Sequence, residues 1–179
     1  MNLLRAVILL ALCFCSTPAW ATRYWVATTG SDANVCTAID GDADPGTYKA
    51  TPSSAMACLT NAGDRLTIKA GTYTAALARI STAVNNVANG TSGNPTIIEG
   101  DPGDAAGCAI ATTCSTIIRP TGIYAAYLNN KSYVTLRKLV LDNANNTSNQ
   151  ATIYVLGIGT GVTLEDVEIK NSIASGLLG

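Results

Sequence analysis

The segment YVTLRKLVLDN, residues 133–143, recurs 28 positions later as GVTLEDVEIKN, residues 161–171. In both copies apolar residues alternate within each half, as in a β-strand, and the alternation slips by one residue in the middle. Each copy therefore predicts a strand, a short bend and a second strand that ends at an asparagine. A repeat of this length made of short strands is typical of a solenoid, and it predicts a parallel β-helix in which each coil stacks on the previous one.

The charges of the two copies support this stacking. Residues at equivalent positions of neighbouring coils lie about 4.8 Å apart, so opposite charges there are favourable. The predicted charge pairs are Arg137 with Glu165, Lys138 with Asp166, and Asp142 with Lys170, and Asn143 with Asn171 is predicted to form an amide ladder. We therefore expect the charged residues of the repeat to stabilise the stack.

Fainter copies of the strand pattern precede and separate the two clear ones. Each carries β-branched or aromatic residues next to a turn residue, and glycine- and asparagine-rich loops separate them. These predicted strands lie within residues 66–73, 95–100, 115–120, 123–130 and 152–157. We expect residues 66–179 to form the first coils of the β-helix.

The N-terminal segment MNLLRAVILLALCFCSTPAWA, residues 1–21, has the parts of a secretory signal peptide. Arg5 supplies a positive charge, an apolar run covers residues 6–15, and small residues flank the tryptophan at the end. We expect cleavage after Ala21 and export of residues 22–179 as a secreted or periplasmic protein. Since the apolar run is short for a membrane span, an uncleaved anchor is the lesser alternative.

Composition excludes several classes of function. The chain contains no histidine, which excludes catalytic triads and zinc sites that depend on it. Its 11 basic and 12 acidic residues nearly balance, and no basic surface for nucleic acid is indicated. Abundant small and β-branched residues with few aromatics suit a layered all-β structure.

Four cysteines remain after signal removal: Cys36, Cys58, Cys108 and Cys114. An even number in an exported chain indicates disulfides, and four cysteines permit three pairings. We favour Cys36–Cys58 and Cys108–Cys114 because each closes a short local loop, worth about 3 and 2 kcal/mol respectively. A reactive thiol or a thiolate metal site is the alternative.

Residues 22–65 are predicted to cap the N-terminal end of the coils, because an open stack exposes a hydrophobic end. The cap would consist of a strand over residues 23–28 and a short helix that begins at Ser53 or Ser54. The expected apolar face of this helix is Ala55, Cys58, Leu59 and Ala62, and Gly63 is the expected C-terminal cap.

Four motifs in order resemble the opening of the pectate-lyase-like superfamily of secreted, right-handed parallel β-helix proteins. They are YWVATTGSDAN (24–34), PSSAMACLTNAGDRLTIKAGTY (52–73), GNPTIIEGDPG (93–103) and YVTLRKLVLDN (133–143). The resemblance implies a right-handed β-helix with an N-terminal capping helix. It leaves the activity open, because this fold serves polysaccharide lyases, glycoside hydrolases, epimerases and adhesins. The segment VCTAIDGDADPG, residues 35–46, is an insertion relative to the family pattern.

The resemblance implies a protein that acts on or binds an extracellular polysaccharide containing uronate. Its lyases use a basic side chain and carboxylate-bound calcium to form an enolate. The basic candidates here, Arg137, Lys138 and Lys170, are better explained by the stacked charge pairs, so the catalytic residues stay unassigned. Asp166 and Glu168, with Asp142 one coil below, are a carboxylate pair that could serve glycoside hydrolysis, although an outer acidic surface is the favoured explanation.

The insertion contains a weak calcium candidate, Asp40, Asp42 and Asp44. Alternate carboxylates can converge on calcium. However, Gly46 lies one place late for an EF-hand loop, and Thr51 stands where that loop has its closing glutamate. A solvated turn is the simpler interpretation.

The last residues, SIASGLLG (172–179), contain no polar cap. We expect the chain to be the N-terminal part of a longer β-helix that is inactive alone, or else to self-associate through its last coil. A non-catalytic surface or adhesion module is the alternative to an enzyme.

A non-reducing peptide map tests the cysteine pairing. We expect linked peptides for Cys36–Cys58 and Cys108–Cys114, and no alkylation of the folded chain before reduction, because the exported protein meets an oxidising environment. Alkylation of any of the four cysteines without reductant would contradict the pairing.

Overall fold

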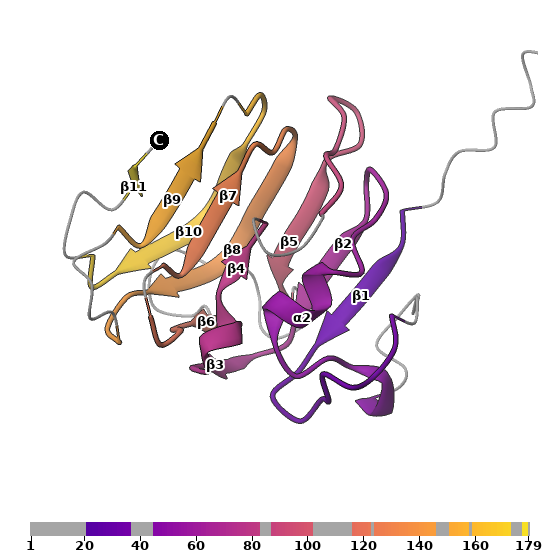
Figure 1. The fold of residues 1–179 in the computed structure, drawn as a ribbon, viewed down its shortest axis with the longest axis vertical. Helices are drawn as coiled ribbons and strands as arrows, with labels where there is room; N and C mark the ends of the chain where they lie inside the picture. The colour runs from indigo at the N-terminus through magenta and orange to yellow at the C-terminus, as the bar shows by residue number, and fades with distance from the viewer. Residues whose placement is uncertain are drawn as a thin grey trace, which may run out of the picture.

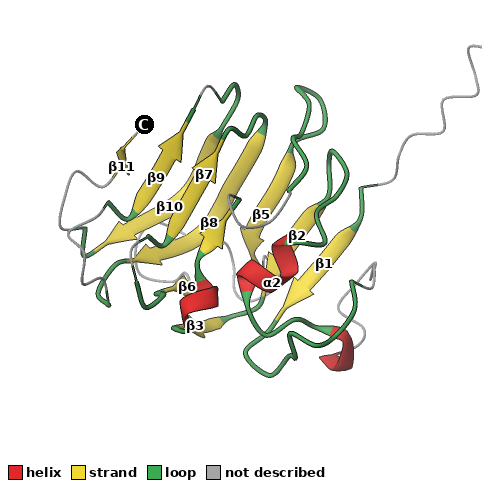
Figure 2. Cartoon of the chain, viewed as in Figure 1, coloured by secondary structure: helices red, strands yellow, loops and turns green. Residues whose placement is uncertain are grey.

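The structure is a computed structural model, and it describes residues 21–36, 45–82, 87–101, 116–122, 124–145, 151–157, 159–172 and 177–178. These residues form mostly parallel β-strands with very little helix, which confirms the predicted all-β class (Figure 2). The first twenty residues of the signal segment, the calcium candidates Asp40, Asp42 and Asp44, and Cys108 and Cys114 lie outside the described residues.

The strands are short, and each follows a β-branched or apolar pattern in the sequence. They are β1 (Arg23–Val26), β2 (Arg65–Ile68), β3 (Gly71–Tyr73), β4 (Ile80–Ser81), β5 (Thr96–Gly100), β6 (Thr116–Ile118), β7 (Ala126–Asn129), β8 (Val134–Asp142), β9 (Ile153–Leu156), β10 (Thr163–Lys170) and β11 (Leu177–Leu178). The short helices are η1 (Pro45–Thr47), α2 (Pro52–Met56) and η2 (Ala76–Ala78).

Every pairing between these strands is parallel, and the pairings build three stacks. The first stack is β1, β2, β5 and the first halves of β8 and β10. The second is β3, β6 and the second halves of β8 and β10, and the third is β4, β7, β9 and β11. From β2 onward the chain visits the three stacks in the same order each time, and we call one such passage a layer. Figure 1 shows the strands of successive layers side by side.

The repeat sets the register between the last two layers. Leu136 pairs with Leu164 and Leu141 pairs with Ile169, as the 28-residue offset predicts. The one-residue slip in the middle is a bend at Lys138 and Asp166, which have φ angles of 55° and 51°. A single residue in the left-handed region turns each strand from the first stack into the second.

Gly100 shows how tightly the layers approach at this bend. It lies one layer below Lys138, and a Cβ atom placed on it would lie 2.1 Å from the Lys138 carbonyl oxygen. Only glycine permits this approach without moving the backbone.

The core is built from columns of inward side chains. Leu66, Ile98 and Leu136 are register partners in successive layers, and all three are fully buried. Leu164, the next member of the column, is 37% exposed because it belongs to the last described layer. The core column is thus fully covered as far as Leu136 and partly open at β10.

The N-terminal cap is shorter than predicted. The predicted N-caps Ser53 and Ser54 are wrong: Thr51 is the N-cap, and its hydroxyl accepts from the Ser54 N–H at 3.4 Å. Pro52 occupies the first helical turn, where its missing N–H costs nothing, and this places the start two residues earlier.

The end of this helix also differs from the prediction. The N–H groups of Cys58 and Leu59 bond to carbonyls three residues back, which closes the helix as a tight turn after Met56. Gly63 is therefore not its C-cap but a turn residue before β2, with a φ of 87°. Ala55 and Leu59 nevertheless lie in the core as predicted, and α2 contacts β1, β2 and β4.

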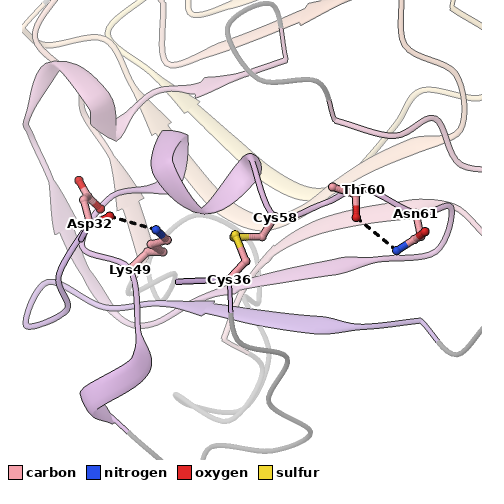
Figure 3. Close-up of a disulfide and its surroundings, with 6 residues drawn as sticks. All are labelled: Asp32, Cys36, Lys49, Cys58, Thr60 and Asn61. Carbon is pink, nitrogen blue, oxygen red and sulfur yellow. Dashed lines mark hydrogen bonds between the residues drawn. A yellow bond between two sulfur atoms is a disulfide. The ribbon is translucent and has the colours of Figure 1, made fainter. Parts of the chain in front are cut away.

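One disulfide ties the cap together, Cys36–Cys58, which confirms that predicted pair (Figure 3). Nearby, the Lys49 ammonium donates to the Asp32 carbonyl, and the Asp32 carboxylate accepts from the Thr51 N–H. These bonds hold the loop after β1 against the start of α2. No helix among the described residues has the length and apolarity needed to cross a membrane.

Equivalent positions of the repeat give a matched test of the core. Leu136→Ala should lower the free energy of unfolding by about 2–5 kcal/mol, because it opens a cavity between two layers. Leu164→Ala should cost about 1 kcal/mol or less, since that side chain is already partly exposed. Urea denaturation of both variants measures the difference, and equal losses would contradict the layered core.

Candidate functional site

Three tyrosines gather on the outside of the third stack. The ring centroids of Tyr124, Tyr127 and Tyr154 are 5.3–5.5 Å apart, and their planes lie within 16–21° of each other. All three rings are half-buried. We call these residues the tyrosine cluster.

Strand alternation positions this cluster. Leu128 of β7 and Ile153 of β9 point into the core, so their neighbours Tyr127 and Tyr154 point outward, where they are register partners. Leu156, two residues beyond Tyr154 on the same face, is 45% exposed. The rings stabilise the stack, and together with Leu156 they leave an apolar surface at the solvent boundary.

Such a surface suits a sugar ring. One face of a pyranose carries C–H groups with slight positive charge, and the face of an aromatic ring is negative. Tyrosine adds a hydroxyl that can bond to the hydroxyls of a sugar. The tyrosine cluster is therefore a candidate carbohydrate contact that the charged residues of the sequence did not indicate. The alternation of inward and outward residues within 123–130 and 152–157 was the sequence signal that could have indicated the cluster.

A second feature is a cavity of about 290 Å³ beside β1, β2 and β5. We call it the arginine cavity, and its lining is Ala21, Arg23, Gly63, Arg65, Asn94, Pro95 and Ile97. Two guanidinium groups border it, and no carboxylate belongs to the lining. The cavity therefore has a positive character that its own walls do not neutralise.

The two arginines face each other across neighbouring strands. Arg23 and Arg65 are register partners, an arrangement of like charges that is unfavourable by itself. Burial lowers the pKa of Arg65, the negative charge of Glu99 opposes this shift, and Arg137 and Arg23 add to it. Glu99 lies 3.5 Å from the Arg65 Nε, on the side of the next layer. An anion in the cavity would relieve the repulsion that remains.

Glu99 is the centre of an ionic network on the first stack. Its carboxylate is fully buried and lies 2.6 Å from an Arg137 nitrogen, and Thr67 donates to it at 3.2 Å. The predicted Arg137–Glu165 pair is present at 3.9 Å, but the contact with Glu99 is much closer. Arg137 therefore stabilises the stack by pairing with Glu99, and the structure gives no reason to treat it as a catalytic base.

Asp142 differs from its expected place on the outer surface, because it is only 1% exposed. Arg119, one layer below, lies 2.7 Å away, and the Asn171 amide donates to Asp142 at the same distance. The predicted pair with Lys170 is wrong: their backbones are in register, but the ammonium of Lys170 lies 3.1 Å from Glu168. The Asn171 amide, predicted to bond Asn143, takes Asp142 as its acceptor.

These contacts determine the ionisation of Asp142. Burial raises its pKa, but the hydrogen bonds from Asn171, the Ala144 N–H and Arg119, with the charge of Arg119, outweigh burial and lower the pKa below its ordinary value. A carboxyl group with a lowered pKa is ionised at neutral pH and cannot act as a general acid there.

The register places Lys138 and Asp166 at equivalent bends of neighbouring layers, as predicted. No ion pair joins their side chains among the described residues. Their backbone conformation turns each side chain away from the regular alternation of the strand. Glu168 is engaged with Lys170. Two of the three carboxylates, those of Asp142 and Glu168, are therefore held in ion pairs.

Lys131 is a functional candidate that the sequence did not single out. Burial lowers its pKa, and its ammonium donates to the carbonyl of Val87. A lowered pKa leaves a larger fraction of a lysine as the neutral amine, the form that can accept a proton. In the described ranges no group of three metal-binding side chains occurs, and the predicted calcium ligands Asp40, Asp42 and Asp44 lie outside these ranges.

Comparisons with known proteins add no identification. No protein-family model, no curated protein and no solved structure matches this chain. The function must therefore be argued from the tyrosine cluster, the arginine cavity and the motifs of the sequence.

The network around Asp142 predicts a pH dependence. A carboxyl group whose pKa is lowered in the folded state stabilises the protein above its unfolded pKa of about 3.9, and this stability is lost as the pH falls through the folded pKa. Asp142→Asn should therefore lower the free energy of unfolding by about 2 kcal/mol at pH 7 and by progressively less below pH about 4.

Asp166→Asn is the matched control, because Asp166 is exposed and asparagine tolerates its backbone conformation. It should show no such pH-dependent loss in the same denaturant titrations. A deficit of Asp142→Asn that stays constant from pH 7 to pH 2 would contradict the assignment.

Proposed function

We propose that this protein is an exported, right-handed parallel β-helix that binds an extracellular polysaccharide carrying uronate carboxylates. The repeated order of the three strand stacks supports the β-helix, and parallel crossover connections are right-handed almost without exception. The four motifs that resemble the pectate-lyase-like superfamily support the same fold and substrate class. The disulfide in the cap agrees with export.

The arginine cavity carries the proposal for uronate. Arg23 and Arg65 border it as like-charged register partners, and its lining contains no carboxylate. A guanidinium group binds a carboxylate through two parallel hydrogen bonds, which an ammonium cannot do. One uronate carboxylate between the two arginines would bring negative charge to this like-charged pair, of which Arg65 also contacts Glu99.

The tyrosine cluster supports the wider assignment to polysaccharide. Its rings offer an apolar platform for the C–H face of a sugar, and the exposed Leu156 extends this platform. The cluster belongs to the third stack and the cavity to the first. The two features are therefore separate contacts with the polysaccharide. The cavity would bind the uronate carboxylate, and the cluster would bind the face of a sugar ring.

A lyase acting on uronates is the second candidate function. Lys131 favours it, because burial lowers the pKa of this lysine and the lyase reaction begins when a base removes the proton next to the carboxylate. Of the three basic candidates of the repeat, Arg137 and Lys170 are held in ion pairs, and Lys138 occupies the bend. Binding without turnover is thus the function that the described residues support best.

A titration calorimetry experiment with matched ligands tests the binding function. An oligogalacturonate should bind residues 22–179, and its methyl ester should bind at least about tenfold more weakly, because the ester keeps the sugar and removes the charge. Arg23→Gln should lower the affinity for the acid form about tenfold. Lys170→Gln, which removes one exposed positive charge outside the cavity, is the control and should change the affinity little.

Variants of the tyrosine cluster separate ring stacking from charge recognition. Tyr154→Ala should weaken binding of the acid and the ester alike, whereas Tyr154→Phe keeps the ring and should retain most of the affinity. Equal affinity for the acid and the ester would overturn the role of the cavity. Formation of unsaturated product that is lost in Lys131→Gln would favour the lyase instead.

A further inference from the structure

A buried carboxylate without a cationic partner lies in the N-terminal cap. Asp64 is fully buried, and its side chain accepts hydrogen bonds from two backbone N–H groups, those of Thr22 and Asn61. No ion pair to Asp64 occurs among the described residues. A buried charge without an opposite charge is costly, so this arrangement is incomplete.

The charge of Asp64 affects the pKa of a neighbouring group, Tyr24. Burial raises the pKa of Tyr24, and the negative charge of Asp64 raises it further, although a hydrogen bond with Thr22 acts in the opposite direction. Tyr24 and Asp64 therefore lie close enough for their charges to interact.

The nitrogen of Thr22 is fixed beside this carboxylate. It lies 3.2 Å from Asp64 Oδ1, and the carbonyl of Thr22 accepts from the Arg65 N–H at 2.8 Å, which continues the pairing of β1 with β2. Ala21, on the other side of the peptide bond, is exposed. The bond at which signal cleavage is expected is thus accessible from one side, and its nitrogen already faces Asp64.

We propose that hydrolysis of the Ala21–Thr22 bond creates the missing partner, an α-ammonium on Thr22 that forms a salt bridge with the buried Asp64. Water supplies the hydroxyl group to the Ala21 carbonyl carbon and a proton to the Thr22 nitrogen, and the amine takes up a second proton at neutral pH. An amide N–H is replaced by an ammonium with three donors, and a bond between two ions is shorter and stronger than the one it replaces. This proposal depends on the predicted cleavage site and is independent of polysaccharide binding.

Processing would then act as a stability switch. The precursor holds a buried, unpaired Asp64, so its cap is weaker than that of the mature chain. Cleavage also removes Ala21 from the wall of the arginine cavity. The mature protein would consequently have both a firmer cap and a more open cavity than its precursor.

Thermal unfolding of the mature chain with free and with acetylated Thr22 tests the salt bridge. Acetylation keeps the N–H that donates to Asp64 and removes only the charge. It can be directed to the α-amine of the chain in urea below pH about 7, because lysine amines there have a higher pKa, and confirmed by intact mass before refolding. We expect the free form to melt at least about 3 °C higher, and Asp64→Asn to abolish this difference.

A control variant separates this effect from general weakening of the cap. Asp32 also accepts hydrogen bonds from cap backbone N–H groups, but these belong to Ala50 and Thr51 rather than to Thr22. Asp32→Asn should lower the melting temperature of both forms and leave their difference intact. A difference that survives in Asp64→Asn, or equal melting of the two wild-type forms, would overturn the proposal.

A rate measurement covers the case in which Asp64→Asn fails to fold. The α-amine of the wild-type chain should be acetylated at least about tenfold more slowly in the folded state than in urea, because an amine held as a paired ammonium is a poor nucleophile. Equal rates would overturn the salt bridge. A mature N-terminus at any residue other than Thr22 would overturn it as well.

Discussion

The structure depends on parallel hydrogen bonding between strands that hold the same register from layer to layer. This register places leucine over isoleucine over leucine along the inner column of Leu66, Ile98 and Leu136. It also places outward residues over one another, so that their charges and rings meet at the strand spacing. A slip of one residue would move every inward side chain to the surface, and for this reason the bends at Lys138 and Asp166 must fall at equivalent positions.

The sequence predicted this register well where two copies of the motif could be aligned, and it predicted the partners of the charged side chains poorly. Arg137 lies opposite Glu165 as expected, yet its closest contact is Glu99 in the layer below. Asp142 likewise binds Arg119 below it. An alignment of two copies reveals only one neighbour of each residue, whereas a middle layer has two, and the lower copy was too faint to align.

The candidate site was less predictable than the fold, for a related reason. Tyr127 and Tyr154 are register partners, but they lie in the faint strands, where loops of different length hide the repeat. Arg23 and Arg65 lie side by side because β1 pairs with β2, although the rest of the cap separates the two strands in the sequence. Short helices such as α2 are also hard to delimit from sequence, because one proline and one side-chain cap decide where they begin.

The layered construction makes unfolding directional. Among the described residues each strand pairs with strands of neighbouring layers, α2 covers one end of the stack, and the Cys36–Cys58 disulfide fastens the cap over that end. At the other end the inward residues Leu164 and Ile169 are partly exposed, so β10 is the least supported of the long strands. Amide hydrogens should consequently exchange in a gradient, fastest in β10 and slowest near β2 and β5, as the chain peels apart one layer at a time. Unfolding would therefore proceed from β10 toward the disulfide-bonded cap rather than as one cooperative transition of all layers.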